Sequence, residues 1–325
     1  MRPIVAILAL SIWVANSALA QDAGNPPLVG VLRSNSTDNI AGASFSTNYR
    51  NALAALGYEI GRNLRLDVRL AEGHVERFPA LADALVRNGV NVIVTFGEPA
   101  TRAAQRATST IPIVAMADDL VGAGLIASLA RPGGNTTGVS LLSIELDAKR
   151  IEILKQILPA GRRFGLLNDP NTSLPTGLRA LAETARIVGV ELQTADVHGP
   201  ADFPAAFAAF RAGGVEAVNM LSSPMLTNFR QELGELILRY KLPTICQFSE
   251  MAVEAGCLAS YGFRVPDAHA LVAAFTIKML KGARADETPA QQPAKLELVV
   301  NLKTARALGI EVPLAILIRA DEVIE

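Results

Sequence analysis

Short apolar runs alternate with amphipathic stretches along most of the chain, and this alternation restricts the fold more than any other feature. The first predicted strands lie at 28–32, 64–70, 90–95 and 111–116. Amphipathic stretches around 45–56 and 78–85 carry apolar residues at helical spacing. Strands that are apolar nearly throughout are typical of parallel sheets with helices on both faces. The N-terminal part of the chain therefore predicts a layered α/β unit.

The same alternation then begins again. A helix is predicted at 145–158, where Pro159 ends the pattern. Further strands are predicted at 164–167, 190–194, 215–221 and 243–246, with helices at 174–188, 203–210 and 225–240 between them. Strand, helix and strand in this order require right-handed crossovers and parallel pairing. We therefore predict two three-layer α/β/α lobes with parallel sheets, and the turn-rich segment 131–138 is the predicted junction.

After residue 246 the pattern is less regular. We predict a strand at 257–261, a helix at 267–280, an irregular Pro-rich segment at 285–293, a strand at 296–300 and a short helix at 302–308. This tail is too small for a third domain. We expect residues 28–140 with about 249–284 to form lobe 1, and residues 141–248 with about 285–325 to form lobe 2. A multi-strand hinge would join them.

The first twenty residues have the features of an export signal. Arg2 precedes an apolar run at 4–14, and Ala18-Leu19-Ala20 has the small-x-small pattern of a cleavage site. The apolar run is about 11 residues long, shorter than the roughly 20 that a membrane span needs. We expect residues 1–20 to be a signal peptide, with a soluble product in the periplasm and no membrane insertion after cleavage. A membrane-anchoring helix is the alternative.

The two cysteines exclude a disulfide scaffold and a Cys-rich zinc module. An oxidising compartment permits a bond between Cys246 and Cys257. Both lie in apolar, strand-like segments, however, where a buried thiol is common. We therefore expect two buried thiols rather than a disulfide.

Charge and motifs both favour a binding protein. Lys and Arg total 30 and Asp and Glu total 31, which argues against the basic surface of a nucleic-acid-binding protein. The sequence has no G-x-S-x-G, H-E-x-x-H or P-loop motif, and no G-x-G-x-x-G after the first strand. His74, His198 and His269 lie far apart without metal-ligand spacing. We expect no catalysis, no metal, no cofactor and a monomeric protein.

Polar residues lie at the carboxyl ends of the predicted strands, where open α/β sheets bind ligands. The candidates in the first lobe are Ser34, Asn35, Thr95, Gly97, Glu98 and Asp118. Those in the second half of the chain are Asn168, Ser222, Ser223, Phe248 and Tyr261. We expect Thr95 and Gly97 to face a carboxylate at a helix N-terminus, Glu98 or Asp118 to bind an ammonium group, and Phe248 or Tyr261 to stack on an apolar group. This set fits a small polar or zwitterionic ligand.

Three stretches carry a resemblance to a known family. They are residues 124–138, residues 145–155, and residues 295–309 with the closing segment 319–325. They resemble the substrate-binding proteins of bacterial ABC transporters, which have the type I periplasmic-binding fold, in the branch with tryptophan- and phenylalanine-binding members. The likeness covers essentially all of 28–325.

The resemblance implies a transport role. Two lobes joined by three strands would close on a small-molecule ligand, an amino acid or an aromatic compound, and dock on the permease subunits of an ABC importer. An exported ligand-sensing subunit of a membrane receptor is the alternative, because the same lobes serve both roles. An exported two-lobed α/β enzyme is disfavoured, because the chain has no recognisable nucleophile–base set.

Overall fold

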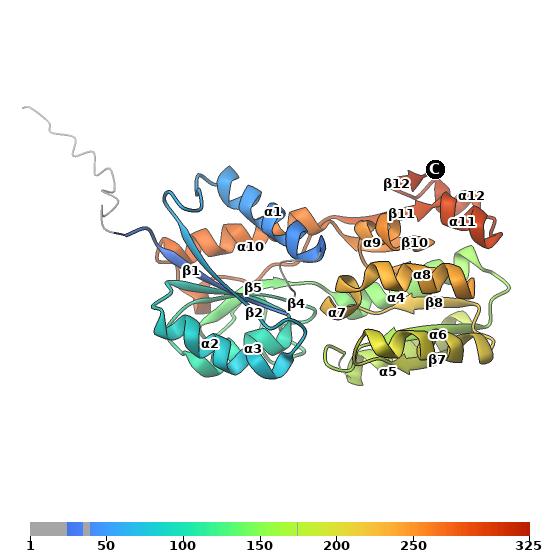
Figure 1. Cartoon of the computed structure of the whole chain (residues 1–325), viewed down its shortest axis with the longest axis horizontal. Coiled ribbons are helices and arrows are strands. Elements are labelled where there is room, and N and C mark those ends of the chain that lie inside the picture. Colours follow the sequence, from blue (N-terminus) through green and yellow to red (C-terminus); the bar gives the residue numbers. More distant parts are fainter. Residues whose placement is uncertain (1–24, 35–39, 174) are drawn as a thin grey trace, which may run out of the picture.

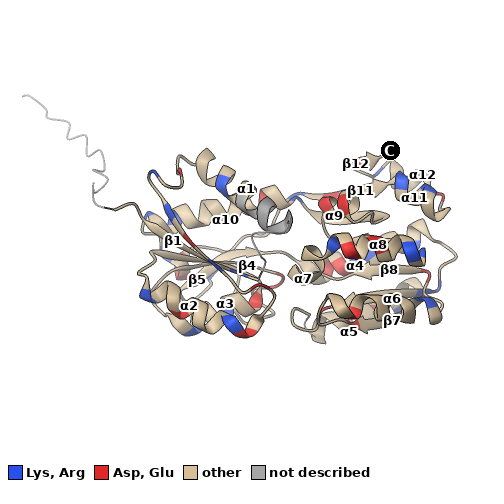
Figure 2. Ribbon diagram, viewed as in Figure 1, with Lys and Arg blue, Asp and Glu red and all other residues tan. Residues whose placement is uncertain are grey.

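The computed structural model describes residues 25–34, 40–173 and 175–325, and these form two lobes side by side (Figure 1). Lobe 1 is built on a five-stranded sheet of order β2-β1-β3-β4-β5 among the described residues. Lobe 2 has a seven-stranded sheet of order β12-β11-β10-β9-β8-β6-β7. Basic residues and acidic residues are interspersed along the ribbon of both lobes (Figure 2). Within the described ranges, every helix is too short or too polar to cross a membrane.

The sheet of lobe 1 is parallel throughout. Its strands are β1 (Leu28–Arg33), β2 (Arg65–Leu70), β3 (Val92–Phe96), β4 (Ile113–Ala117) and β5 (Thr136–Ser140). Helices α2 (Phe78–Arg87) and α3 (Glu98–Ala107) cover one face, and α1 (Ile40–Ala55) and α10 (Val265–Leu280) cover the other (Figure 1). A short 3-10 turn, η1 (Val75–Arg77), precedes α2. Val31 packs toward α10 and Leu32 toward α2, because successive strand residues point to opposite faces.

Lobe 2 repeats the layered arrangement. Its strands are β6 (Arg163–Asn168), β7 (Glu191–Asp196), β8 (Ala217–Met220), β9 (Thr244–Cys246), β10 (Ala259–Phe263), β11 (Leu296–Asn301) and β12 (Glu322–Ile324). The core on one face contains α4 (Ser143–Ile157), α5 (Pro175–Val188), α11 (Leu302–Leu308) and α12 (Leu314–Leu317). The core on the other face contains α6 (Phe203–Ala212), α7 (Pro224–Asn228), α8 (Arg230–Tyr240) and α9 (Ser249–Glu254). The predicted class of two α/β lobes is confirmed.

Two details of the second lobe differ from the prediction. β10 and β11 pair antiparallel, whereas the expected sheets were wholly parallel. The chain leaves lobe 2 at the end of β10, forms α10 on lobe 1 and returns from that side, so β11 runs in the opposite direction. The helix predicted at 225–240 is two helices, α7 and α8, which meet at Phe229.

The chain crosses between the lobes at three places, after β5, after β10 and before β11. The first and third crossings lie side by side. The Ser140 N–H donates to the Gln291 carbonyl (2.9 Å), and the Gln291 N–H donates to the Gly138 carbonyl (2.8 Å). The predicted junction 131–138 was placed too early, because Thr136 already begins β5. Gly138 has a φ of 143°, and a side chain there would collide with the Ala115 backbone of β4.

The segment 249–284 divides between the two sheets. α10 packs on α1 and on strands of lobe 1, in line with the expectation for lobe 1. α9 and β10 instead belong to lobe 2, where β10 pairs with β9 and β11. Ala259 at the start of β10 is buried in the lobe 2 core, whereas Phe263 at its end packs in the core of lobe 1, where the chain crosses over.

Cys246 and Cys257 form a disulfide, with their Cα atoms 6.3 Å apart. The prediction of two buried thiols was wrong. Cys246 ends β9, and Cys257 stands just before β10, which pairs with β9. The chain between them folds back through α9, which brings the two Cα atoms within the range for a disulfide. The spacing of ten residues between the two cysteines does not predict that the chain folds back in this way.

Candidate functional site

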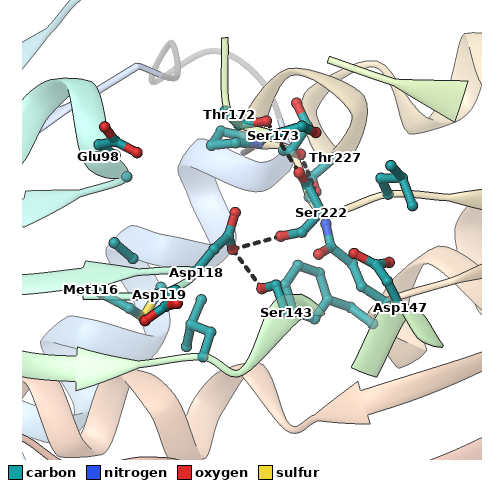
Figure 3. Close-up of a pocket in the computed structure, with 18 of the residues that line it drawn as sticks. Glu98, Met116, Asp118, Asp119, Ser143, Asp147, Thr172, Ser173, Ser222 and Thr227 are labelled. Atoms are coloured by element: carbon teal, nitrogen blue, oxygen red, sulfur yellow. Dashed lines mark hydrogen bonds between the residues drawn. The ribbon is translucent and has the colours of Figure 1, made fainter. Parts of the chain in front are cut away.

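A cleft lies between the lobes and encloses a cavity of about 200 Å³. Its walls are formed by the carboxyl ends of strands in both sheets, by the loops that follow them (Figure 3), and by residues of helices, among them α4, α5, α7 and α10. Six of the eleven predicted site residues line it: Gly97, Glu98, Asp118, Ser222, Ser223 and Phe248. Four others, Ser34, Thr95, Asn168 and Tyr261, are not among the described residues of the lining. Asn35 lies outside the described residues.

The four predicted residues away from the cleft have contacts within their own lobes. The Thr95 and Thr101 hydroxyls are hydrogen-bonded at 2.8 Å, which joins β3 to α3. The Asn168 amide donates to Asp196 Oδ1 of the neighbouring strand (2.7 Å). The Tyr261 carbonyl accepts from Arg150 (2.7 Å), and the Ser34 carbonyl accepts from an N–H group of the β2–α2 loop (2.8 Å). These groups hold the framework around the cleft.

The expected carboxylate site at the start of α3 differs from the observed geometry. The Gly97 N–H donates to the Met116 carbonyl of β4 (2.8 Å), and the Thr95 hydroxyl is bonded to Thr101. The first residue of the helix is Glu98, whose negative charge opposes a second anion at this end. Both donors named for a ligand carboxylate are therefore engaged within lobe 1.

Asp118 connects the two lobes. It follows β4, and its Oδ1 accepts hydrogen bonds from the Ser143 hydroxyl (2.6 Å) and the Ser222 hydroxyl (2.7 Å) (Figure 3). Ser222 follows β8 of lobe 2, so this bond spans the cleft. Burial raises the pKa of Asp118, and the two hydroxyl donors act against that rise. The second carboxylate oxygen points away from both serines, toward the side of Glu98 and Thr172 (Figure 3).

Glu98 is the second predicted carboxylate in the cleft. It lies at the N-terminus of α3, where Gly97 has a φ of 88°. Its Oε1 accepts from Arg102 Nε one helical turn away (2.6 Å). The charge of Glu98 is thus partly balanced by its own helix, whereas the Asp118 side chain is hydrogen-bonded to neutral hydroxyls.

Hydroxyl groups line the cleft wall of lobe 2, and the sequence analysis named only two of them. Thr172 and Ser173 lie in the loop after β6, and Thr227 lies in α7. The Ser223 hydroxyl donates to Asp169 Oδ2 (2.7 Å) and accepts the Met225 N–H at the start of α7 (3.0 Å). The expectation that ligands bind at strand ends indicated the loop after β6, but the residue predicted there was Asn168, the last residue of the strand, rather than Thr172 or Ser173.

A buried ion pair stands at the base of this wall. Arg150 Nη2 lies 2.5 Å from Asp147 Oδ1, one helical turn apart on α4, and Asp147 lines the cleft. Burial raises the pKa of Asp147 to about 6, although the Arg150 charge acts in the other direction. Arg150 also donates to the Tyr261 carbonyl, which ties α4 to β10. The sequence analysis missed this pair because i, i+3 charges usually lie on exposed helix faces.

Comparison with known proteins supports a specific family. Residues 43–324 match the family model described as ABC transporter substrate binding protein. The tyrosine-binding protein of Clostridioides difficile (strain R20291) is 25% identical over 263 residues, which are 80% of this chain and 75% of that protein.

Two solved structures have closely similar folds. A conserved domain protein from Vibrio cholerae has a TM-score of 0.84 with 28% identity, over 92% of this chain and 100% of that one. The ABC domain from Streptococcus pneumoniae in complex with L-Trp has a TM-score of 0.81 with 24% identity, over the same shares of the two chains. Since the family model covers most of the sequence, this chain belongs to the ABC transporter substrate binding protein family.

Proposed function

We propose that the protein binds an aromatic amino acid in the cleft between its lobes and delivers it to the membrane permease of an ABC importer. The observation that carries the proposal is the cleft itself, with carboxylates and aromatic rings on its walls and hydroxyls across from them. Its volume of about 200 Å³ is below the roughly 300–1,000 Å³ of pockets for drug-sized ligands, which favours a smaller solute. The tyrosine-binding relative supports the same ligand class.

The cleft offers a partner for each part of such a ligand. The free side of the Asp118 carboxylate, with Glu98 nearby on the same wall, would accept an ammonium group (Figure 3). Phe248, which packs edge-on against Phe263 at 5.1 Å between ring centres, would contact the aromatic ring. Closure of the lobes buries the ligand, and the permease would select the closed form through its differential affinity.

We also propose that the protein acts outside the cytoplasm as a monomeric carrier rather than as an enzyme. The signal-like segment 1–20 supports export. The Cys246–Cys257 disulfide supports the same conclusion, because such bonds persist in oxidising compartments. Mass spectrometry of the exported protein should find an N-terminus near Gln21 and both cysteines oxidised. An intact N-terminus would contradict the cleavage.

A thermal-shift screen tests the ligand class. The panel contains L-tyrosine, L-tryptophan, L-phenylalanine, L-leucine, glucose and adenine, with calorimetry on each hit. Aromatic amino acids should raise the melting temperature most, since a ligand at 100 times its Kd adds about 2.7 kcal/mol to the unfolding free energy. A shift with glucose or adenine and none with the amino acids would contradict the proposal.

A further inference from the structure

Arg33, Phe96 and Met116 form a row across the cleft wall of lobe 1. They stand at the carboxyl ends of β1, β3 and β4, which are neighbours in the sheet. Phe96 of β3 is paired in register with Met116 of β4. Leu32 of β1 is paired with Thr95 of β3, so the next residue of each strand, Arg33 and Phe96, stands at the same level of the sheet. Residues in register on adjacent strands share one face of the sheet. All three members of the row line the cleft.

The Arg33 end of the row is a buried positive corner. Arg33 is 6% exposed, and its guanidinium carbon lies 5.8 Å from the centre of the Phe96 ring. His269 of α10 packs edge-on against the same ring at 5.8 Å. Burial lowers the pKa of Arg33 to about 10 and that of His269 to about 4, with the Arg33 charge adding to the second effect. At neutral pH the arginine is therefore charged and the histidine is neutral.

The other arginine that lines the described cleft serves a structural purpose. Arg230 donates from Nε to Glu254 (2.7 Å) and from Nη1 to the Thr227 carbonyl (3.0 Å), which ties α8 to α9 and α7. Arg33 faces the cleft from the end of a strand, next to a ring and a neutral imidazole. A guanidinium has five donors in a planar fork, so it binds a carboxylate through two of them while keeping other contacts.

We propose that Arg33 is the carboxylate-binding residue of the cleft, so that the ligand's carboxylate lies over β1 and β3 and its amine lies toward Asp118. The inference rests on the proposed function and deepens it by naming the residue that recognises the ligand's carboxylate. Two strand spacings, about 10 Å, separate β1 from β4. Arg33 and Asp118 therefore approach the ligand's α-carbon from opposite sides, and the side chains of Phe96 and Met116 line the wall between them.

Three indole ligands test the assignment by calorimetry. L-Tryptophan has both charged groups, L-tryptophanamide lacks the carboxylate, and indole-3-propionate lacks the ammonium. The wild-type protein should bind the two carboxylates, and L-tryptophan more tightly than its amide. Arg33→Met should lose about tenfold to a hundredfold in affinity for both carboxylates, the range for hydrogen bonds to charged groups. Its affinity for the amide should change less than about threefold.

Two further variants separate binding from folding. Arg33→Lys keeps the positive charge but loses the planar set of donors, so it should retain part of the preference for L-tryptophan over L-tryptophanamide. If Arg33→Met does not fold, this variant shows whether residue 33 binds the carboxylate. Arg230→Met should weaken acid and amide alike, through α9, and leave their ratio as in the wild type. If the ratio of the affinities for L-tryptophan and L-tryptophanamide in the Arg33 variants also equals that of the wild type, the inference is overturned.

The ligand set also distinguishes this inference from the proposed function. If L-tryptophan binds equally well with and without Arg33, the proposed function is supported and the inference about Arg33 is contradicted. Binding of indole-3-propionate that depends on Arg33, without binding of L-tryptophan, keeps Arg33 as the carboxylate residue and contradicts the amino acid as ligand. A wild-type protein that binds neither carboxylate overturns the inference.

Discussion

The two lobes meet the same cleft with different chemistry. Lobe 1 contributes ionisable groups at its strand ends, among them Arg33, Glu98 and Asp118. Lobe 2 contributes hydroxyls such as Ser222, its charged lining residues Asp147 and Arg230 are paired within the lobe, and its interior carries the Cys246–Cys257 disulfide. The comparison indicates that the two lobes have different roles at the cleft. Under the proposed function, charge recognition would fall mainly to lobe 1, and lobe 2 would supply the hydroxyl-lined wall that faces it.

The largest effect should come from breaking the buried ion pair of lobe 2. Arg150→Met leaves the Asp147 carboxylate buried without its cation, which should lower the unfolding free energy by about 3–5 kcal/mol at neutral pH. Chemical denaturation measures it. Arg186→Met is the matched control, because the Arg186–Glu183 pair is also spaced i, i+3 but is largely exposed, and should cost less than about 1 kcal/mol. Equal losses would mean that burial of the pair is unimportant.

Acid should act in opposite directions through His269 of lobe 1 and Asp147 of lobe 2. The folded pKa of His269 in lobe 1, about 4, is below its ordinary value of 6.5. The unfolded chain therefore binds more protons between these values, and this contribution to stability is lost as the pH falls from 6.5 to 4. For Asp147 the folded pKa is about 6, above 3.8, so its contribution grows as the pH falls through that range.

His269→Gln isolates the lobe 1 contribution. Between pH 7 and pH 4 the wild type should lose roughly 3 kcal/mol more unfolding free energy than the variant, because the pKa of His269 is about 4 in the folded protein and 6.5 in the unfolded chain. Urea denaturation at the two pH values measures the difference. A constant difference between the two proteins would show that His269 titrates normally in the folded state.

The disulfide should contribute to the stability of lobe 2. The double variant C246S/C257S should lose about 3 kcal/mol of unfolding free energy, the scale for closing a short loop. Reductant should destabilise the wild type by a similar amount and leave the double variant unchanged. Since Phe248 and Met251 of the enclosed segment line the cleft, ligand affinity should fall as well. A wild type that is indifferent to reductant would contradict this role.

The two carboxylates of lobe 1 should differ in their effect on binding. Asp118→Asn should cost about 1.5–3 kcal/mol in the binding of L-tryptophan or L-tyrosine. Glu98→Gln should cost less, because Glu98 is already paired with Arg102. Calorimetry on both variants measures the difference. If both bind as tightly as the wild type, neither residue holds the ammonium group.

The smallest effect should come from the bond that joins the lobes. Ser222→Ala removes a donor of lobe 2 from Asp118 and should shift the ligand-free protein toward an open form by about 0.5–1.5 kcal/mol. Small-angle scattering should find a larger radius of gyration. Ser143→Ala is the comparison, because Ser143 also belongs to lobe 2 and donates to the same oxygen, but it stands three residues after β5, where the chain itself joins the lobes, so its loss should open them less. Similar radii for both variants would remove Ser222 as a lobe-to-lobe contact.

Part of the fold was predictable because periodicity is local. The runs at 28–32 and 164–167 each became a strand within one residue or two of the expected ends. The strand Thr136–Ser140 was missed because its Thr- and Gly-rich sequence also suits a turn. No element was assigned to Glu98–Ala107, although its alanines favour the helix that forms there.

The candidate site was only half predictable. The rule that ligands bind at strand ends places a residue at the correct edge of a sheet, but it does not say which way the side chain points. Thr95 and Phe96 are adjacent, yet the first bonds to α3 and the second lines the cleft. His269 and Arg33 are far apart in sequence, and both pack against Phe96 only because α10 returns to lobe 1.

The sequence by itself therefore determined the two α/β lobes and the edges of the sheets that line the cleft, because these follow from local periodicity and strand ends, and three motif stretches carried the family resemblance. Only the tertiary structure decided which of those residues face the cleft, that Cys246 and Cys257 are bonded, and that Asp118 connects the lobes. These contacts join segments whose proximity depends on strand order and on the three crossings between the lobes. That order is set by the packing of the whole chain.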